Sequence, residues 1–107
     1  MEMKKIYMVL RQLGVTSKHK GYYYLAEAVR IRIRSQRPYY ITKELYPALA
    51  RQFGIKESAV DSGIRRLSRY CWEHHRDLLI HMAGYTLEQP PTNQQFIEIV
   101  AFCVLVS

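Results

Sequence analysis

The chain has 107 residues, enough for one domain with a single modest core that needs no metal or disulfide to fold. Sixteen Lys and Arg against nine Asp and Glu leave a formal charge of +7, which favours an anionic partner such as nucleic acid or an acidic membrane surface. The short apolar run Ile6 to Leu10 excludes a signal peptide or spanning helix at the N-terminus. We therefore expect one cytoplasmic domain, residues 1–107, that has no membrane partner.

The first third of the chain predicts two helices. Residues 4–13 form a short helix. It ends at Gly14, because glycine adopts the left-handed conformation of a helix end without steric strain. A longer helix is expected from about Gly21 to Gln36, ended by Pro38. Its apolar stripe is Tyr22, Leu25, Val29 and Ile33, which places Ala26, Arg30, Arg34 and Arg37 on the opposite face. The substring RIRIR alternates like a strand, but the longer pattern favours a helix.

Two further helices are predicted in the middle of the chain. Thr42 is a good cap for the next segment, and Pro47 predicts a break at Tyr46, since an interior proline removes a backbone donor. A helix then starts at Pro47 and stops at Gly54. The next helix runs from about Glu57 to His75. Its inner face carries Val60, Ile64, Leu67 and Cys71.

The C-terminal third predicts a short helix, Asp77 to Ala83, and a final helix from Asn93, with Thr92 and Gln95 as a capping box. The expected fold class is therefore all-α, a compact bundle of about six helices. Residues 99–106 are apolar on every face, and such a helix must be covered. We expect residues 96–106 to lie in a homodimer interface or against another protein.

Chemistry-bearing side chains do not form a recognisable catalytic or metal-binding pattern. Cys71 and Cys103 lie far apart in apolar surroundings and predict buried thiols. His74 and His75 point about a hundred degrees apart on a helix and cannot share a metal. We expect no enzyme activity, no cofactor and no metal.

The segment around Gly54 has the pattern of a helix-turn-helix. Small Ala50 lets two helices cross closely, Gly54 takes the turn conformation, and Val60 with Ile64 buries the second helix against the first. An ordinary helical hairpin is the alternative interpretation. The outer face of the second helix carries Ser58, Ser62, Arg65 and Arg69.

Several motifs resemble one known family. They are GYYYL from Gly21, ITKELYPALARQF from Ile41, Ile64-Arg65 with Trp72, GYT from Gly84, and PTNQQFI from Pro91. In order and spacing they are similar to the C-terminal effector domain of the sporulation master regulator, stage zero sporulation protein A. The resemblance covers about residues 10–100.

The resemblance implies a bundle of about six helices that binds a short DNA element as tandem copies and contacts RNA polymerase. In the family, a phosphorylated receiver domain lies upstream. Only a dozen residues precede the resemblance here, so we expect a free-standing relative or an excised domain, without an aspartyl-phosphate site.

The recognition helix departs from the family pattern. An Arg, an acidic residue and an Arg that contact DNA in the family fall on Ala59, Asp61 and Ser62, while a further arginine is retained as Arg65. Since a good bidentate contact contributes about 1–3 kcal/mol of base discrimination, we expect an altered or weaker base preference. Asp61 either contacts cytosine or makes a capping box with Ser58.

These considerations divide the predicted DNA contacts into two sets. The residues expected near base edges are Ser58, Ala59, Asp61, Ser62 and Arg65. Those expected near the DNA backbone are Lys18, His19, Lys20, Arg66 and Arg69. The first set includes only one long donor, Arg65. Arg30, Arg34 and Arg37 either add a second basic face or form an ordinary solvated face.

The predicted function is a transcription regulator that binds double-stranded DNA and reads the major groove with the helix from Glu57. Two alternatives are a protein-interaction module, which meets RNA polymerase or a full-length regulator through the apolar C-terminal helix, and a sequence-blind DNA binder. Cations gathered on one face favour DNA binding, whereas scattered cations favour the interaction module.

Overall fold

A computed structural model describes residues 2–35, 37 and 40–107. Within these ranges the chain forms helices and no strand, which confirms the predicted all-α bundle. The elements are α1 (Glu2–Gln12), α2 (Tyr22–Arg34), the π-helical turn η1 (Ile41–Leu45), α3 (Tyr46–Phe53), α4 (Glu57–His74), α5 (Arg76–Ala83) and α6 (Asn93–Val106). The predicted end of the second helix at Gln36 and Pro38 lies outside the described residues.

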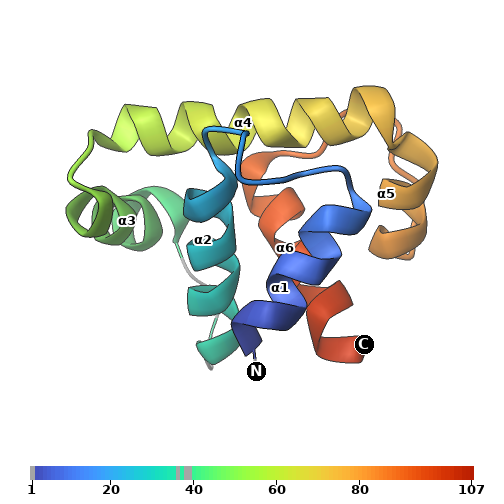
Figure 1. The fold of residues 1–107 in the computed structure, drawn as a ribbon, viewed down its shortest axis with the longest axis horizontal. Coiled ribbons are helices and arrows are strands. Elements are labelled where there is room, and N and C mark those ends of the chain that lie inside the picture. Colours follow the sequence, from blue (N-terminus) through green and yellow to red (C-terminus); the bar gives the residue numbers. More distant parts are fainter. Residues whose placement is uncertain (1, 36, 38–39) are drawn as a thin grey trace.

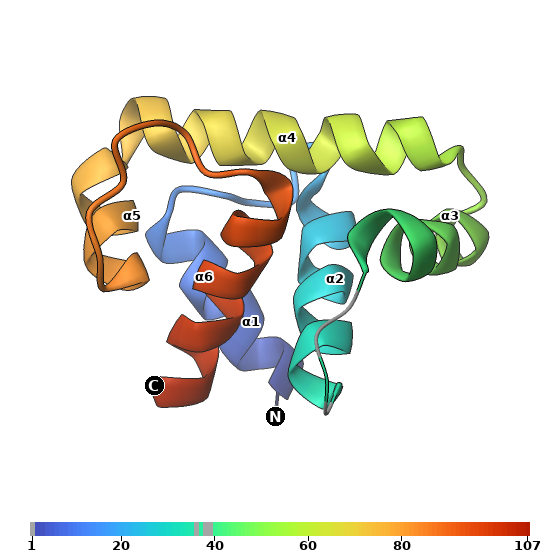
Figure 2. The ribbon, with the colours of Figure 1, turned by 180° about the vertical axis from the view of Figure 1, so that it is seen from behind.

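Helix α4 runs along one side of the molecule, over the ends of the other helices (Figure 1). Helices α1, α2 and α6 descend from its middle, α3 lies under its N-terminal end, and α5 lies under its C-terminal end (Figure 2). Helix α6 packs against α1, α2, α4 and α5, so it forms the centre of the bundle. The side of α4 that faces away from this bundle is therefore left to solvent.

The core follows the predicted inner faces, with one correction. Val60, Ile64, Leu67 and Cys71 of α4 are all buried. Ala26, which we predicted on the outer face of α2, is instead fully buried. The prediction was wrong because α2 packs against α1, α4 and α6, so that more than one of its sides is covered. The predicted helix, rather than a strand, is confirmed for the RIRIR segment.

The segment before α3 differs from the prediction. Thr42 is not a cap, because it lies inside η1, whose first flanking residue is Tyr40. The chain does not break at Tyr46, where φ is −62° and ψ is −43°; its N–H donates to the carbonyl of Ile41, five residues back. Pro47 lies in the first turn of α3, a position at which proline is common. The backbone therefore passes from π to α geometry while it remains helical.

Helix α6 begins with the predicted capping box of Thr92 and Gln95. Its apolar C-terminal half is covered mainly by the chain itself. Ile99, Val100, Ala101 and Val104 are buried, because α1, α2 and α5 surround this helix. The prediction that another molecule must cover the whole helix was therefore wrong. Three apolar side chains remain exposed, namely Phe102 (53%), Leu105 (64%) and Val106 (65%).

The loop between α1 and α2 lies directly against α4. A Cβ atom added to Gly21 would come within 2.4 Å of the carbonyl oxygen of Gly63, which is in the middle of α4. Gly63 faces Gly21 in return, since its own added Cβ would lie 3.3 Å from the Gly21 Cα. This pair of glycines brings the loop and α4 into backbone contact.

We expect Gly21→Ala to lower the free energy of unfolding by about 1–3 kcal/mol, because the methyl group overlaps the Gly63 carbonyl. The φ of Gly21 is −83°, so alanine fits the backbone itself. Without the overlap, the loss of unfolded-state entropy would make the change stabilising. Urea unfolding measures the sign. Gly54→Asn is the control, since no atom lies within 4 Å of an added Cβ there and asparagine tolerates a left-handed residue.

Candidate nucleic-acid interface

Helices α3 and α4 are joined by a three-residue turn, residues 54–56, at the place predicted for a helix-turn-helix. Gly54 has φ 65° and ψ 39°, the left-handed conformation that favours glycine, and its N–H donates to the Ala50 carbonyl. The N–H of Ile55 donates to the same carbonyl at 3.1 Å. Val60 and Ile64 then bury α4 against the helices beneath it. The connection is consistent with the predicted helix-turn-helix.

The outer side of α4 carries small side chains in its first two turns and arginines beyond them. Ser58, Arg65 and Arg69 are exposed, whereas Ala59 and Ser62 are half-buried. The hydroxyl of Ser62 donates to the backbone carbonyl of Ser58 at 2.8 Å, so it is turned back onto its own helix. Arg65, with 52% of its side chain exposed, is therefore the first long donor on this face.

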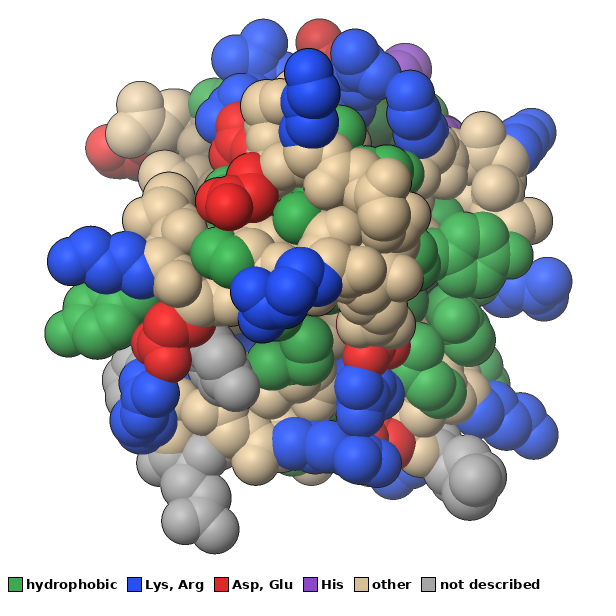
Figure 3. All heavy atoms as spheres, turned by 90° about the vertical axis from the view of Figure 1, so that its left-hand side faces the viewer, with side chains coloured by type: hydrophobic (Ala, Val, Ile, Leu, Met, Phe, Trp, Pro, Cys, Tyr) green, Lys and Arg blue, Asp and Glu red, His purple; other side chains and the backbone are tan. Residues whose placement is uncertain are grey.

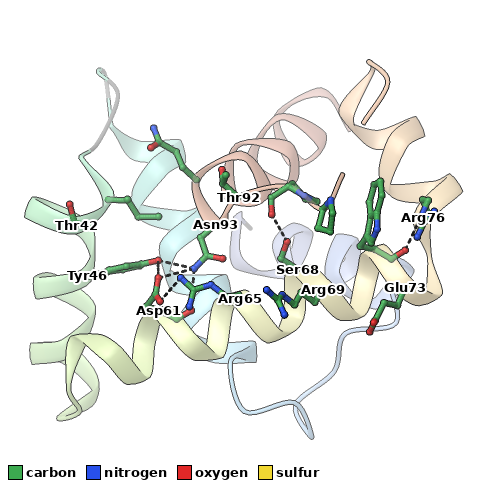
Figure 4. Close-up of a pocket in the computed structure, with 15 residues that line it drawn as sticks. Thr42, Tyr46, Asp61, Arg65, Ser68, Arg69, Glu73, Arg76, Thr92 and Asn93 are labelled. Atoms are coloured by element: carbon green, nitrogen blue, oxygen red, sulfur yellow. Dashed lines mark hydrogen bonds and ion pairs between the residues drawn. The ribbon is translucent and has the colours of Figure 1, made fainter. Parts of the chain in front are cut away.

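Asp61 does not form the capping box that we considered with Ser58. Helix α4 starts after Lys56, an extended residue, and the start has no side-chain cap. Ser58 is consequently inside the first turn and not ahead of it. The carboxylate of Asp61 points instead toward α3 and the beginning of α6 (Figure 4).

Tyr46, Asp61 and Asn93 form a hydrogen-bonded junction of three helices, shown in Figure 4. The Tyr46 hydroxyl donates to Asp61 Oδ1 at 2.7 Å. The Nδ2 of Asn93 donates to the Tyr46 hydroxyl at 2.8 Å and lies 3.2 Å from Asp61 Oδ1 and 3.1 Å from the Asp61 carbonyl oxygen. Burial, together with the bond to Asp61, raises the pKa of Tyr46 to about 12. Sequence reasoning missed this junction because its members are 15 and 32 residues apart.

Arg65 is tied to the same junction. One of its terminal nitrogens, Nη2, lies 2.6 Å from Asp61 Oδ2, one helical turn before it on α4. The Asp61 carboxylate thus uses one oxygen toward Tyr46 and Asn93, and the other toward Arg65. The guanidinium is held on the side of α4 that faces α6.

A groove of about 880 Å³ runs along this side of α4, between it and residues 90–94 (Figure 4). Arg65, Arg69 and Arg76 line it, with the carboxylates of Asp61 and Glu73 as the acidic members. The guanidinium carbon of Arg76 lies 4.1 Å from the centre of the Trp72 ring. Its Nε also donates to the Trp72 carbonyl. This edge of α4 therefore combines three arginines with two carboxylates.

The opposite edge of α4 is bordered by the loop that carries Lys18, His19 and Lys20. The His19 ring lies 4.8 Å from the ring of Tyr70, which is one turn beyond Arg66 on the same edge. The loop is also shaped internally, since His19 Nδ1 lies 3.2 Å from the Thr16 backbone nitrogen. Lys18 and Lys20 are exposed, whereas His19 is half-buried in this packing. The structure thus brings both predicted sets of residues to α4 and the loop beside it.

The arginines of α2 and the segment after it are paired with carboxylates. The ion pairs are Arg30 with Glu27, Arg32 with Glu98, Arg34 with Glu2, and Arg37 with Glu44. The hydrogen bond from Arg30 also lowers the pKa of Glu27. The candidate second basic face is therefore a solvated face whose charge is compensated locally.

The cations around α4 differ from those of α2. Within the part of the chain that the structure describes, no carboxylate pairs with Arg66, Arg69, Lys18 or Lys20. Figure 3 looks at the α3 end and shows several Lys and Arg side chains along the upper edge, over α4, with a few acidic side chains among them. Near the bottom of that view, basic side chains lie next to acidic ones. Cations without a carboxylate partner among the described residues therefore lie along α4 and the loop beside it, whereas the arginines of α2 are paired.

Other functional sites have little support in the described ranges. Residues 2–35, 37 and 40–107 contain no group of three potential ligands arranged for a metal ion. Cys71 is a buried thiol and Cys103 a half-buried one, and neither forms a disulfide. Among the described helices, none has the length and apolar character needed to cross a bilayer.

Comparison with protein families identifies one match over nearly the whole chain. The family model described as "Sporulation initiation factor Spo0A C terminal" matches residues 6–104. The match includes the α3–α4 pair, the loop at Lys18 to Lys20 and the Asn93 end of the junction.

We expect Tyr46→Phe to lower the free energy of unfolding by about 1 kcal/mol at neutral pH, because Asp61 and Asn93 each lose a hydrogen bond. The loss should shrink in alkali. Tyrosine ionises near pH 10 in the unfolded chain and at about 12 in the folded protein, so its stabilisation is complete below pH 10 and disappears as the pH rises to 12.

Chemical unfolding between pH 7 and 12 measures this difference. Tyr85→Phe is the matched control, since Tyr85 is exposed, and it should change stability by less than about 0.5 kcal/mol. A difference between wild type and Tyr46→Phe that stays constant up to pH 12 would contradict the role of the buried hydroxyl.

Proposed function

The chain belongs to the family of Spo0A C-terminal domains, DNA-binding domains of a sporulation transcription regulator and not enzymes, and from this we propose that it reads the DNA major groove with α4. Residues 1–107 would act as one domain. The observation that carries the proposal is the distribution of charge. Among the described residues, Arg66, Arg69, Lys18 and Lys20 have no carboxylate partner and lie at α4 and the adjacent loop, whereas the arginines of α2 are paired.

Arg65 is the principal base reader in this proposal. Its side chain projects from the start of the third turn of α4, directly after the two turns of a recognition helix that usually contact base edges, and it is the first long donor on that face. A guanidinium has five donors, so it can pair with Asp61 and still give two parallel N–H groups to guanine. Arg65 would therefore specify a guanine in the site.

The remaining base-facing positions of α4 are small or already bonded. Ser58 and Ala59 have short side chains, the Ser62 hydroxyl bonds its own helix, and Asp61 bonds Tyr46 and Asn93. Long donors at such positions provide about 1–3 kcal/mol of discrimination per good bidentate contact. The base preference is consequently altered from that of relatives with arginines at 59 and 62.

Affinity for DNA that does not depend on base sequence comes from the cations beside the base-facing positions of α4. Arg66 and Arg69 continue the outer face of α4, and Lys18 and Lys20 extend it onto the loop. Phosphate contacts of this kind orient a protein on the duplex. His19 supports the loop through its packing on Tyr70 and also lies near the backbone.

A second function is favoured by the exposed end of α6. Phe102, Leu105 and Val106 present apolar surface near the C-terminus of the described chain, away from α4 (Figure 1). Either a second copy of this chain or RNA polymerase would cover them while α4 holds DNA. Such contacts add to DNA binding, whereas an interaction module that binds no DNA is the rival function.

Replacing Arg65 by alanine should reduce discrimination at one base pair by about tenfold, because one bidentate contact is lost. Replacing Lys20 by alanine should weaken all sequences alike and lower the dependence of log K on log salt by about one, because one phosphate contact is lost. Arg34→Ala is the control, since Arg34 is paired with Glu2 and lies away from α4. Equal effects of the Arg65 and Lys20 changes on every sequence would contradict this division of roles.

Selection from random duplex DNA, followed by affinity measurements against salt, identifies the site. An enriched motif with a guanine supports the proposal. A steep salt dependence without any motif identifies a sequence-blind binder, and no binding at low salt leaves the interaction module.

If a second copy covers α6, light scattering at micromolar concentration should give twice the monomer mass, and Phe102→Glu should restore the monomer. The new carboxylate would be buried without a partner in such an interface. Ser107→Glu is a control that adds the same charge beyond the apolar residues. A wild-type mass equal to that of the monomer would contradict the homodimer.

A further inference from the structure

We propose that Asp61 sets base discrimination indirectly, as a positioning residue that orients Arg65, and makes no base contact of its own. This inference rests on the proposed function, in which Arg65 reads a base pair. It assigns Asp61 a role different from the direct contact considered from the sequence.

The hydrogen bonds of Asp61 point away from the reading face. Its Oδ1 accepts from Tyr46 at 2.7 Å, and Asn93 Nδ2 lies 3.2 Å from the same oxygen. Tyr46 is 5% exposed and Asn93 is 9% exposed, so neither can exchange Asp61 for water easily. A cytosine contact would require the carboxylate to leave these partners, and buried polar groups without partners are costly. The direct contact is therefore disfavoured by the fold.

The groups that hold the Asp61 side chain lie on helices other than α4. Tyr46 belongs to α3 and Asn93 begins α6, so the carboxylate is held from two neighbouring helices (Figure 4). Asn93 Nδ2 also donates to the Asp61 backbone carbonyl at 3.1 Å. Both the side chain and the main chain of this residue are thus fixed before DNA arrives.

Because Asp61 is held in place, its ion pair with Arg65 also restricts the arginine side chain. The distance from Asp61 Oδ2 to Arg65 Nη2 is 2.6 Å, and the arginine side chain is otherwise half exposed. A free arginine loses considerable rotamer freedom when it binds, and a pair already formed in the free protein removes part of that loss. The pair also fixes the plane of the guanidinium, which a bidentate contact to guanine requires.

The Asp61–Arg65 ion pair contributes too little to folding stability for stabilisation to be its main role. Exposed pairs four residues apart on a helix contribute little to folding. The junction with Tyr46 and Asn93 supplies the structural part, and an asparagine at position 61 can keep it through its amide oxygen. The amide nitrogen would then face the guanidinium, donor against donor, and release Arg65.

We expect Asp61→Asn to reduce discrimination about tenfold at the base pair that Arg65→Ala identifies, with an unchanged salt dependence. In the Arg65→Ala background, Asp61→Asn should cause no further loss of discrimination. Glu73→Gln is the matched control, because it removes the same charge from the exposed face of α4 and should leave base preference intact. Thermal unfolding of each variant separates these effects from loss of fold.

A measurement on the wild-type protein covers the case in which Asp61→Asn does not fold. In NMR relaxation of the free protein, the Arg65 Nε–H should be more ordered than that of Arg69, which has no ion pair in the described chain. Equal mobility of the two groups would overturn the inference.

The outcomes distinguish this inference from its premise. If Arg65→Ala relaxes no base pair, the proposed function fails and the inference falls with it. If Arg65→Ala relaxes one base pair and Asp61→Asn leaves that pair unchanged, only the inference is overturned. A second relaxed base pair on adding Asp61→Asn to Arg65→Ala shows that Asp61 reads a base itself, and also overturns it.

Discussion

Tyr46 donates a hydrogen bond to Asp61, and Asn93 donates to both, and these bonds hold α4 in this fold. They join α3, α4 and α6 at the place where the N-terminal end of α4 lies over α3 (Figure 2). Because the buried hydroxyl and amide have partners only when the three helices are in register, the junction disfavours other arrangements. The direction of α4, and with it that of Arg65, depends on these bonds.

Carboxylates control where positive charge is available on this basic chain. On α2 and after it, each acidic partner compensates a nearby arginine, which leaves a surface of ordinary solvated ion pairs. At α4 only Arg65 has such a partner, and that partner is part of the junction. Positive charge therefore remains effective where the helix and the Lys18 to Lys20 loop meet solvent. The ion pairs thus compensate the arginines of α2 and leave the cations of α4 and the Lys18 to Lys20 loop available to a polyanion.

Local patterns predicted the elements well, and two of the misses share a cause. Gly54, the capping box at Thr92 and the inner face of α4 were readable, since each depends on residues within a few turns. Ala26 was misplaced because α2 is covered on more than one side, and Ile99, Val100, Ala101 and Val104 of α6 proved to be covered by the chain's own helices. These errors concern what packs against an element, which its own periodicity does not record.

The sequence alone determined the helices, the turn at Gly54, the excess of positive charge and the resemblance to one family, because backbone propensity, capping and periodicity act over short distances. Only the tertiary structure decided which charges are compensated and what Asp61 does. Glu2 meets Arg34 and Asn93 meets Asp61 across 32 residues each, and no local pattern encodes such pairs. The position of Arg65 on α4 is therefore a property of the packed bundle, since the groups that bond its partner Asp61 come from neighbouring helices.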